Sequence, residues 1–262
     1  MALYIGIDIG SVFSKGVLIN DKDVAATCVT RSGSNYSDTA EKIRQELLRE
    51  AKILEDVVIS TAATGSGAAN VKYANQSVSD MHCTARGIHS IFPDAKMAVD
   101  IGTQATKVIR IDARGQAVNF AVSERCAAGG ARFVDIVANV LRIDLDDFGE
   151  LAMRSQNPVT FSTSCAVFGE SEAVTRVAQG IPKEDIAAGV NQALAGKIAS
   201  MIKKVGLEKP CVACGGGALN TGLLKTLEKQ LQTGILVPPQ PQIVTALGAA
   251  ITAAHAAVTS DK

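Results

Sequence analysis

Residues 8–15 read Asp-Ile-Gly-Ser-Val-Phe-Ser-Lys, and residues 100–107 read Asp-Ile-Gly-Thr-Gln-Ala-Thr-Lys. The aspartate of each stretch lies at the end of an apolar run, at 3–9 and at 95–100, that is typical of a buried strand. In both copies a second strand, a turn and a third strand come next. An internal duplication of this kind fixes the architecture, because each copy is one structural unit. We therefore predict an α/β fold with two related lobes whose Asp-Ile-Gly loops face one ligand.

The rest of the chain alternates strands and helices around these two units. Apolar runs bounded by turn residues predict strands, and apolar residues at helical spacing predict helices. The predicted strands cover residues 3–9, 15–19, 24–30, 57–61, 95–100, 107–112, 117–123, 210–214 and 235–237. The predicted helices cover residues 37–54, 83–92, 130–142, 145–154, 168–179, 183–206, 219–231 and 243–257.

The start of the second copy gives the predicted boundary between the lobes. The first lobe is expected to cover residues 1–94, with the C-terminal helix in 243–262 packing back on it. The second lobe is expected to cover residues 95–242. No linker rich in Pro, Ser or Gly separates the two stretches, so we expect the lobes to be closely coupled.

The composition is that of an ordinary globular protein, with 47% hydrophobic and 20% charged residues among 262. Lys and Arg total 26, as do Asp and Glu. This balance argues against a non-specific nucleic-acid or membrane-surface binder, which needs a basic excess. We expect no membrane span of roughly 18–20 apolar residues and no signal peptide. The expected location is the cytoplasm, with no nucleic acid or membrane as partner.

The first Asp-Ile-Gly loop brings phosphate-binding groups together. Gly10 allows a tight turn whose backbone N–H groups bind phosphate oxygens, and Ser11 and Ser14 add hydroxyls. Asp8, at the end of the strand, suits Mg²⁺, usually through water. Lys15 is expected to neutralise a terminal phosphate.

The second loop repeats this chemistry with Asp100, Gly102, Thr103 and Lys107. Asp100 is again predicted near the metal. Gln104 is suited to orient an attacking water, a role that glutamine has in other nucleotide hydrolases. An Asp and a Gly after a strand are also common in ordinary turns. Two copies with matching lysines favour a nucleotide site over two unrelated turns.

A third loop follows the strand predicted at 210–214. It contains Gly215, Gly216 and Gly217, and Asn220 lies near the start of the next helix. Glycines let a nucleoside approach the backbone closely. We predict that these four residues bind the nucleotide together with the two Asp-Ile-Gly loops.

The chain has six cysteines, at positions 28, 83, 126, 165, 211 and 214. In a cytosolic chain they are buried packing residues, reactive thiols or metal ligands. Cys211 and Cys214 have Cys-x-x-Cys spacing, but no second pair lies nearby in sequence and their stretch predicts a core strand. Packing is the favoured role for Cys28 and Cys83.

The three loops resemble those of the actin, sugar kinase and Hsp70 superfamily of ATPases. Within it, nearly the whole chain resembles the activators of 2-hydroxyacyl-CoA dehydratases and the ATPase subunits of benzoyl-CoA reductases (BadF/BadG/BcrA/BcrD type). The stretches that carry the resemblance are Gly-Ile-Asp-Ile-Gly-Ser at 6–11, Cys-Ala-Ala-Gly-Gly-Ala-Arg-Phe at 126–133, Ser-Cys-Ala-Val-Phe-Gly-Glu-Ser-Glu at 164–172, the loop at 215–220 and Ala-Leu-Gly-Ala-Ala at 246–250.

The resemblance implies an α/β, duplicated actin/Hsp70-like (ribonuclease H-like) two-lobe fold with a nucleotide cleft between the lobes. It implies ATP or ADP with Mg²⁺, and one [4Fe–4S] cluster shared between the subunits of a dimer. Such a cluster usually needs four thiolates. Cys126 and Cys165, in loops that lead into helices, supply half a site, which a twofold axis doubles.

The implied activity is ATP hydrolysis coupled to electron transfer at very low potential. The implied acceptor is an iron–sulfur acyl-CoA dehydratase or reductase, and the implied electron source is reduced ferredoxin or flavodoxin. The sequence leaves open whether the dimer is a homodimer or a heterodimer with a related ATPase subunit.

The second loop departs from the family pattern, which is usually Asp-Ile-Gly-Gly-Gln-Asp. Thr103 and Ala105 replace the second Gly and the Asp. The missing carboxylate predicts slower hydrolysis or weaker Mg²⁺ handling, and supports one alternative, a slow or non-hydrolysing regulatory subunit of such a complex. The other alternative is a small-molecule (sugar) kinase of the same fold with Asp100 as its base, although no recognisable sugar-binding motif accompanies it.

Overall fold

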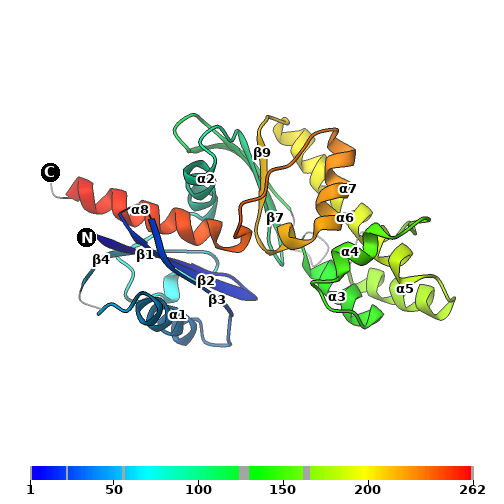
Figure 1. The fold of residues 1–262 in the computed structure, drawn as a ribbon, viewed down its shortest axis with the longest axis horizontal. Coiled ribbons are helices and arrows are strands. Elements are labelled where there is room, and N and C mark those ends of the chain that lie inside the picture. The colour runs from blue at the N-terminus through cyan, green and yellow to red at the C-terminus, as the bar shows by residue number, and fades with distance from the viewer. Residues whose placement is uncertain (1, 22, 55–56, 124–129, 162–165, 261–262) are drawn as a thin grey trace. The chain divides into compact units, whose positions relative to one another are not determined.

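The computed structural model describes residues 2–21, 23–54, 57–123, 130–161 and 166–260. The chain forms two compact units. Unit 1 consists of residues 1–96, 111–118 and 242–262, and unit 2 consists of residues 97–110 and 119–241. Each unit contains a sheet with its own covering helices (Figure 1).

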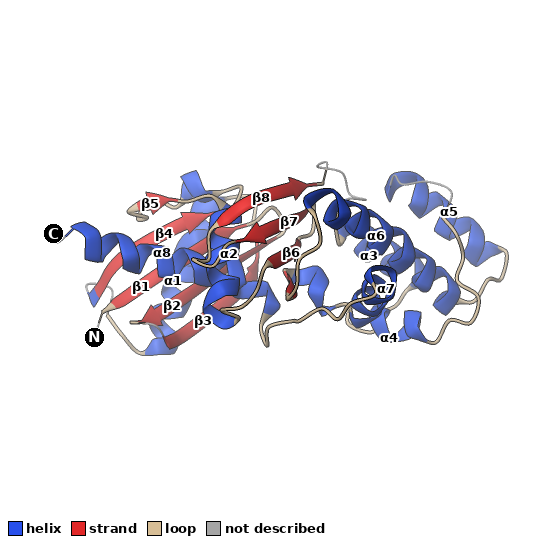
Figure 2. Ribbon diagram, turned by 90° about the horizontal axis from the view of Figure 1, so that it is seen from above, coloured by secondary structure: helices blue, strands red, loops and turns tan. Residues whose placement is uncertain are grey.

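Unit 1 contains a five-stranded sheet in the order β3-β2-β1-β4-β5, and β1 to β4 lie side by side in Figure 2. β1 pairs antiparallel with β2 and parallel with β4. The strands are β1 (Leu3–Ile9), β2 (Phe13–Asn20), β3 (Asp23–Arg31), β4 (Val58–Thr64) and β5 (Gln76–Ser77). The helices are α1 (Tyr36–Ala51), the 3₁₀ turn η2 (Ala68–Asn70), α2 (Asp80–Ile91) and α8 (Val244–Ser260), which the 3₁₀ turn η5 (Pro241–Ile243) precedes.

Helices cover both faces of the unit 1 sheet. Successive residues of a strand point to opposite faces. Ile5 and Ile7 of β1 therefore pack with Ile43 of α1 on one face, and Tyr4 packs with Ala250 of α8 on the other. Figure 1 shows α1 and α8 on opposite sides of β1 and β2. The first and last parts of the chain thus share one core.

The segment Pro241–Val258 is long and apolar enough to cross a membrane, by length and composition only. We expected no apolar run of this length from the sequence. However, 56% of it is buried inside the protein, because α8 packs against α2, β1 and β4. Its apolar character is therefore that of a core helix of unit 1.

Unit 2 repeats the topology of unit 1 with four strands in the order β8-β7-β6-β9. β6 pairs antiparallel with β7 and parallel with β9, as β1 does with β2 and β4. The strands are β6 (Met97–Ile101), β7 (Thr106–Ile111), β8 (Ala117–Val122) and β9 (Cys211–Cys214). The helices are α3 (Arg132–Leu141), α4 (Phe148–Met153), α5 (Ala166–Ala178), α6 (Lys183–Val205), the 3₁₀ turn η4 (Gly216–Leu219) and α7 (Thr221–Leu231). The predicted duplication is confirmed.

The core of unit 2 lies on one face of its sheet. Val99 of β6 and Val108 of β7 belong to one buried cluster with Phe133 of α3, Ile198 of α6 and Leu227 of α7. This cluster fixes the start of α3 relative to the strand that precedes the second Asp-Ile-Gly loop.

Two predicted elements differ from the structure. Residues 235–237 do not form a strand, because only Leu236 is bridged, to Val212 of β9. The helix predicted at 145–154 begins at Phe148. Before it, the N–H of Asp147 donates to the carbonyl of Asp144 at 3.2 Å, which makes a tight turn in place of a first helical turn.

Candidate functional site

The β1–β2 hairpin places Asp8 directly opposite Lys15. Lys15 Nζ donates to Asp8 Oδ2 at 3.0 Å, and the two side chains are only 18% and 11% exposed. Asp8 also stands beside Thr64, near the end of the parallel strand β4. Ligands of open α/β sheets bind outside the carboxyl ends of such strands. The predicted carboxylate and ammonium therefore meet at the edge where a phosphate would bind.

The β6–β7 hairpin of unit 2 has the same arrangement. Asp100 stands opposite Lys107, and Lys107 Nζ donates to Asp100 Oδ2 at 3.2 Å. Asp100 also stands beside Cys214 at the end of the parallel strand β9. In each copy the structure thus pairs the predicted aspartate with the predicted lysine, a contact that the sequence did not predict.

A glycine follows the parallel strand in both units and lies against the carboxylate. Gly65 has φ +84° and Gly215 has φ +80°, a conformation that L side chains rarely adopt. A β-carbon on Gly65 would overlap the Asp8 carboxylate, and one on Gly215 would overlap that of Asp100. These two glycines let the loop after β4 and the loop after β9 lie directly against the aspartates of their own units.

The sequence predicted a nucleotide role for the loop after β9 but none for its counterpart, the small-residue loop after β4. Gly67 and Gly217 also correspond to each other. Gly67 lies against Ile9, which follows Asp8, and Gly217 lies against Ile101, which follows Asp100. The signal for this counterpart was a Gly-x-Gly directly after the fourth strand of each copy. Ser66, between Gly65 and Gly67, makes it less obvious than three consecutive glycines.

The loop residues between the hairpin strands are more accessible than the charged pairs. Thr103 is half-buried and Gln104 is exposed. The N–H of Gly102 donates to the carbonyl of Ala105 at 3.0 Å, which closes the turn. Gly10 and Ser11 are likewise half-buried in the first loop. The residues of both loops are thus partly accessible to solvent, although the N–H of Gly102 is already bonded within its own turn.

Ser14 and Asn220 have partners within the protein. Ser14 is fully buried, and because it is next to Lys15 on β2 it points to the opposite face of the sheet. Its Oγ is 2.6 Å from Ser32 Oγ. Asn220 caps α7, since its Oδ1 accepts from the N–H of Leu223 at 2.9 Å, and its Nδ2 donates to Asn191 Oδ1 at 2.9 Å. The structure does not bring Ser14 beside Asp8, and the nucleotide contacts of both residues stay predictions.

The helices α3 and α5 begin beside each other in unit 2. Phe133, in the first turn of α3, lies against Gly169 of α5, where a β-carbon would come within 2.6 Å of its ring. The Phe161 ring meets the Phe133 ring edge-on, with centroids 5.5 Å apart. Phe133 of α3 therefore contacts both Phe161 and the first turn of α5.

Cys126 and Cys165 lie outside the described residues. In the sequence, Cys165 immediately precedes α5 and Cys126 precedes α3 by a short glycine-containing stretch. Helix N-termini carry partial positive charge and stabilise thiolates. The role of Cys126 and Cys165 as cluster ligands stays a prediction. Within the described part of the chain, no group of three or more His, Cys, Asp or Glu residues is placed to hold a metal ion.

Three other cysteines are buried packing residues. Cys83 is in α2, and Cys211 and Cys214 are in β9. Burial raises the pKa of Cys83 and of Cys211 to about 12, so both are thiols at neutral pH. Residues three apart on a strand point to opposite faces. The Cys-x-x-Cys pair in β9 therefore does not point its two sulfurs at one metal.

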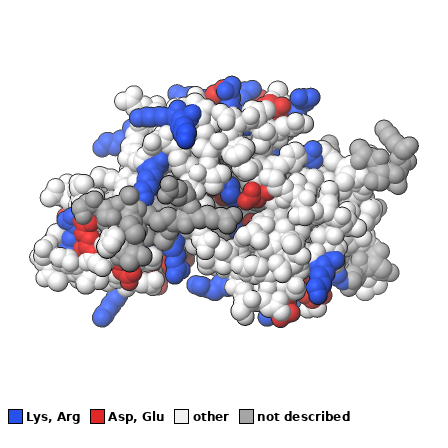
Figure 3. Space-filling view, turned by 180° about the vertical axis from the view of Figure 1, so that it is seen from behind, with Lys and Arg blue, Asp and Glu red and all other residues white. Residues whose placement is uncertain are grey.

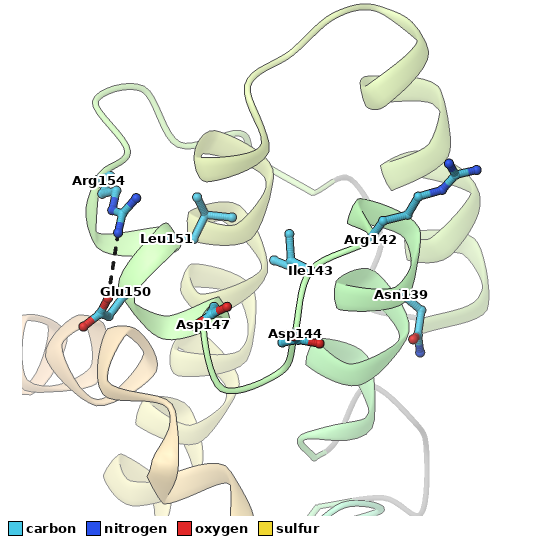
Figure 4. A pocket seen from close by; sticks show the side chains of 8 residues that line it. All are labelled: Asn139, Arg142, Ile143, Asp144, Asp147, Glu150, Leu151 and Arg154. Carbon is cyan, nitrogen blue, oxygen red and sulfur yellow. Dashed lines mark ion pairs between the residues drawn. The ribbon is translucent and has the colours of Figure 1, made fainter.

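A pocket of about 670 Å³ lies in unit 2 between α3 and α4. Its lining includes Arg142, Asp144, Asp147 and the pair formed by Arg154 and Glu150 at 3.8 Å (Figure 4). None of the predicted site residues lines it. On the face of the protein in Figure 3, acidic and basic side chains lie in small groups, and most of the surface carries neither.

The sequence of the whole chain identifies its relatives. Residues 5–253 match the BadF/BadG/BcrA/BcrD ATPase family. The chain belongs to this family. The (R)-2-hydroxyglutaryl-CoA dehydratase activating ATPase of Acidaminococcus fermentans is 36% identical over 256 residues, 97% of this chain and 98% of that protein. The 2-hydroxyisocaproyl-CoA dehydratase activator of Clostridioides difficile is 34% identical over 258 residues, 98% of this chain and 97% of that protein.

Solved structures confirm the predicted fold class. The Clostridium difficile activator of 2-hydroxyisocaproyl-CoA dehydratase, with bound ADPNP, superposes with a TM-score of 0.94 at 33% identity, covering 99% of this chain and 97% of that one. A ROK family glucokinase from Streptomyces griseus superposes with a TM-score of 0.60 at 12% identity, covering 97% of this chain and 100% of that one, and shows the fold alone. As a BadF/BadG/BcrA/BcrD ATPase, the chain is assigned ATP or ADP as its nucleotide and ATPase activity.

Proposed function

We propose that this ATPase is a low-potential electron donor that holds a [4Fe–4S] cluster between two chains and activates a partner acyl-CoA dehydratase or reductase. The observation that carries the proposal is the convergence of α3 and α5 at Phe133 and Gly169. In the sequence, Cys126 and Cys165 lie shortly before these two helices. The dehydratase activators among the relatives support the choice of partner.

In this proposal ATP with Mg²⁺ lies in a cleft between the lobes, which cover residues 1–94 and 95–242. Asp8 and Asp100 would lie near the Mg²⁺ ion. Lys15 and Lys107 would leave these carboxylates and bind the phosphates. The paired geometry supports this, because each lysine is held at the strand edge by its aspartate. Backbone N–H groups of the glycine loops bind phosphate and nucleoside.

Hydrolysis in the proposal uses Gln104 to orient water, and it gives ADP and phosphate. Gln104 is exposed on the loop that contains Gly102 and Thr103, so its amide is accessible for this role. Ala105 supplies no carboxylate at the next position. We therefore expect hydrolysis by the isolated chain to be slow.

The proposed cluster site uses Cys126 and Cys165 from each of two chains. Two cysteines per chain are half of a four-thiolate site, and a twofold axis completes it. The partial positive charge at the starts of α3 and α5 would stabilise the thiolates. A reduced cluster, when bound, supplies one electron at low potential, which the partner enzyme gains. Reduced ferredoxin or flavodoxin is the proposed source of that electron, in the cytoplasm.

Cysteine variants prepared without oxygen test the proposal. We expect about four irons and four sulfides per two chains in the wild type, and loss of nearly all iron in Cys126→Ser and in Cys165→Ser. Cys28→Ser is the matched control, because Cys28 lies on β3 at the other unit's sheet and should keep full iron. Unchanged iron in either of the first two variants, with an intact fold, would contradict the cluster assignment.

Ala105 favours a second candidate, a regulatory subunit that binds nucleotide and hydrolyses it slowly or not at all. This candidate shares the nucleotide site with the first. Measuring ATP turnover in the iron-loaded protein, with and without a second ATPase subunit, separates the two. Measurable turnover by the chain alone, even if it is slow, supports the electron donor. Turnover that appears only when the other subunit is added supports the regulatory role.

A further inference from the structure

Ser32 was not predicted as a site residue, yet it is bonded to the first Asp-Ile-Gly loop at two points. Its hydroxyl donates to the carbonyl of Gly10 at 2.6 Å, and its N–H donates to the carbonyl of Val12 at 2.8 Å. Ser32 directly follows β3, in the connection that leads to α1. The residue after the third strand of unit 1 therefore holds the turn between the first two strands.

The hydroxyl of Ser32 also lies 2.6 Å from Ser14 Oγ. A serine hydroxyl has one proton to donate, and a carbonyl oxygen can only accept. The proton of Ser32 is therefore used on Gly10, so the proton between the two hydroxyls comes from Ser14. Ser14 is fully buried. Its hydroxyl thus supports Ser32 and has no proton left to donate to a phosphate.

The bond from Ser32 to Gly10 fixes the direction of the next N–H. The Gly10–Ser11 peptide is trans, and in a trans peptide the C=O and the N–H point in opposite directions. Because the Gly10 carbonyl points to Ser32, the N–H of Ser11 points away from Ser32. No backbone carbonyl among the described residues accepts from this N–H, and Ser11 is only half-buried. The N–H of Ser11 is therefore available to a phosphate oxygen.

The second loop has the same arrangement with a different donor. The carbonyl of Gly102 accepts from the N–H of Ala131 at 2.9 Å, so the N–H of Thr103 points away from Ala131. Thr106 has the position of Ser14 in this hairpin, but its buried hydroxyl has no hydrogen-bond partner in the described part of the chain. In both units the glycine carbonyl is thus bonded within the protein, by a side-chain hydroxyl in unit 1 and by a backbone N–H in unit 2.

We propose that Ser32 is a positioning residue for nucleotide binding, whose hydroxyl holds the Gly10–Ser11 peptide so that the N–H of Ser11 binds a phosphate oxygen of ATP. The proposal rests on the proposed function for the place of the phosphates at the Asp-Ile-Gly loops. It adds a residue from outside these loops, and it states which N–H of the first loop binds phosphate. Ser32 itself contacts no nucleotide, because it acts through Gly10.

Ser32→Ala removes the hydroxyl, and Ser34→Ala is its matched control. Ser34 lies further along the same connection and is exposed. Iron-free protein is titrated with ATP and, separately, with adenosine, which has no phosphate. Loss of one neutral hydrogen bond should raise the dissociation constant for ATP by about 3- to 10-fold in Ser32→Ala. The dissociation constant for adenosine should stay unchanged in this variant, and Ser34→Ala should bind both ligands as the wild type does.

Ser32→Thr keeps the hydroxyl and should restore the affinity for ATP. Unchanged affinity for ATP in a folded Ser32→Ala protein would overturn the proposal. An equal loss of affinity for ATP and for adenosine would also overturn it, because Ser32 would then support the whole site and not the phosphate contact. If Ser32→Ala does not fold, Ser32→Cys takes its place. A thiol is a weaker donor of similar size, so the same selective loss of ATP affinity is expected, and its absence would contradict the role of Ser32.

Exchange of the Ser11 amide proton with water, followed by NMR in the wild type, separates this proposal from the proposed function. We expect bound ATP to slow this exchange. If ATP slows it and Ser32→Ala still binds ATP normally, only the role of Ser32 is wrong. If bound ATP leaves the exchange unchanged, the phosphates do not lie at the first loop, and the proposed place of the nucleotide is wrong as well. No iron is present, so the result is independent of the cluster assignment.

Discussion

Lys15 and Asp8 form a nearly buried ion pair across the β1–β2 hairpin, with Nζ and Oδ2 3.0 Å apart. The same pair recurs in the second hairpin as Lys107 and Asp100 at 3.2 Å. Removing one member of a buried pair leaves an uncompensated charge, which costs more than the pair contributes. In the proposed function Asp8 would face Mg²⁺ and Lys15 a phosphate, so the bound nucleotide would neutralise both charges.

Lys15→Met should weaken ATP binding. A hydrogen bond to a charged group is worth about 1.5–3 kcal/mol, so we expect the dissociation constant to rise by about 10- to 100-fold. Calorimetric titration measures it. Lys225→Met is the control, because Lys225 pairs with Glu228 on the surface of α7 and is 70% exposed, and it should bind ATP as the wild type does. Equal affinity in the two variants would remove Lys15 from the site.

Gly65→Ala should destabilise the fold more than a change of φ alone explains. Gly180→Ala is the comparison, since Gly180 has φ +75° but no atom within 4 Å of a β-carbon. We expect Gly180→Ala to cost about 1–2 kcal/mol. Overlap with the Asp8 carboxylate should add about 1–3 kcal/mol in Gly65→Ala. Urea unfolding of both variants gives the difference, and equal costs would show that the contact with Asp8 is unimportant.

Ala105→Asp should speed ATP hydrolysis. It restores the carboxylate that the family usually has beside Gln104, where it can hold Mg²⁺ or its water ligands. We expect kcat to rise by about tenfold, which corresponds to about 1.4 kcal/mol of transition-state stabilisation. Ala105→Asn has nearly the same shape without the charge. A similar acceleration in both variants would contradict a role for the charge.

Arg176→Met should loosen the chain around Cys165. Arg176 Nη2 donates to the Thr160 carbonyl at 2.7 Å and to Glu172 Oε1 at 2.6 Å, so it joins α5 to the segment that precedes residues 162–165. We expect the free energy of unfolding to fall by about 1.5–3 kcal/mol. We also expect faster iron loss in air and a changed spectrum of the reduced cluster.

The control for Arg176→Met is Arg154→Met, because Arg154 makes an exposed 3.8 Å pair with Glu150. Exposed pairs contribute about 0–1 kcal/mol. Iron retention and the spectrum should both stay as in the wild type. A loss of stability in Arg176→Met with an unchanged spectrum would make Arg176 a purely structural residue.

Stability should fall above about pH 9 because of the buried thiols. Cys83 and Cys211 have pKa values raised by burial from 9.0 to about 12. The unfolded chain therefore loses these protons first, so their stabilising effect is complete below pH 9 and disappears as the pH rises toward 12. At pH 10 each thiol should account for a loss of about 1 kcal/mol.

Unfolding of Cys211→Ala across this pH range isolates one thiol. The difference in unfolding free energy between wild type and Cys211→Ala should shrink from pH 8 to pH 10, since only the wild type loses the contribution of this group. A constant difference would mean that Cys211 keeps its ordinary pKa in the folded protein.

The sequence predicts the fold of this protein well because the duplication is visible at residue level. Asp8 and Lys15 match Asp100 and Lys107 in type and spacing, and the hairpin register follows from that spacing. The second strand pair, β4 with β1 and β9 with β6, is less visible. Its signal is only a short apolar run before Gly65 or Gly215, so the sequence predicts no nucleotide role for the loop after β4.

The candidate site was harder to predict, because residue type alone does not show which way a side chain points or which partner it has in the protein. Ser14 is a hydroxyl beside Lys15, but strand alternation turns it to the other face, against Ser32. Asn220 has the right type for a ligand contact, and it also has the right position to cap α7. The bond from Ser32 to the Gly10 carbonyl joins residues that are far apart in the chain, and a backbone acceptor leaves no mark in sequence spacing.

Native mass spectrometry of protein purified without oxygen tests the central claim most directly, because one spectrum reports chains, cluster and nucleotide together. We expect a species of two chains with one [4Fe–4S] cluster, and nucleotide bound to the ATPase subunits. Single chains, or paired chains without iron and sulfide under the same conditions, would contradict an electron donor whose cluster is shared between two subunits.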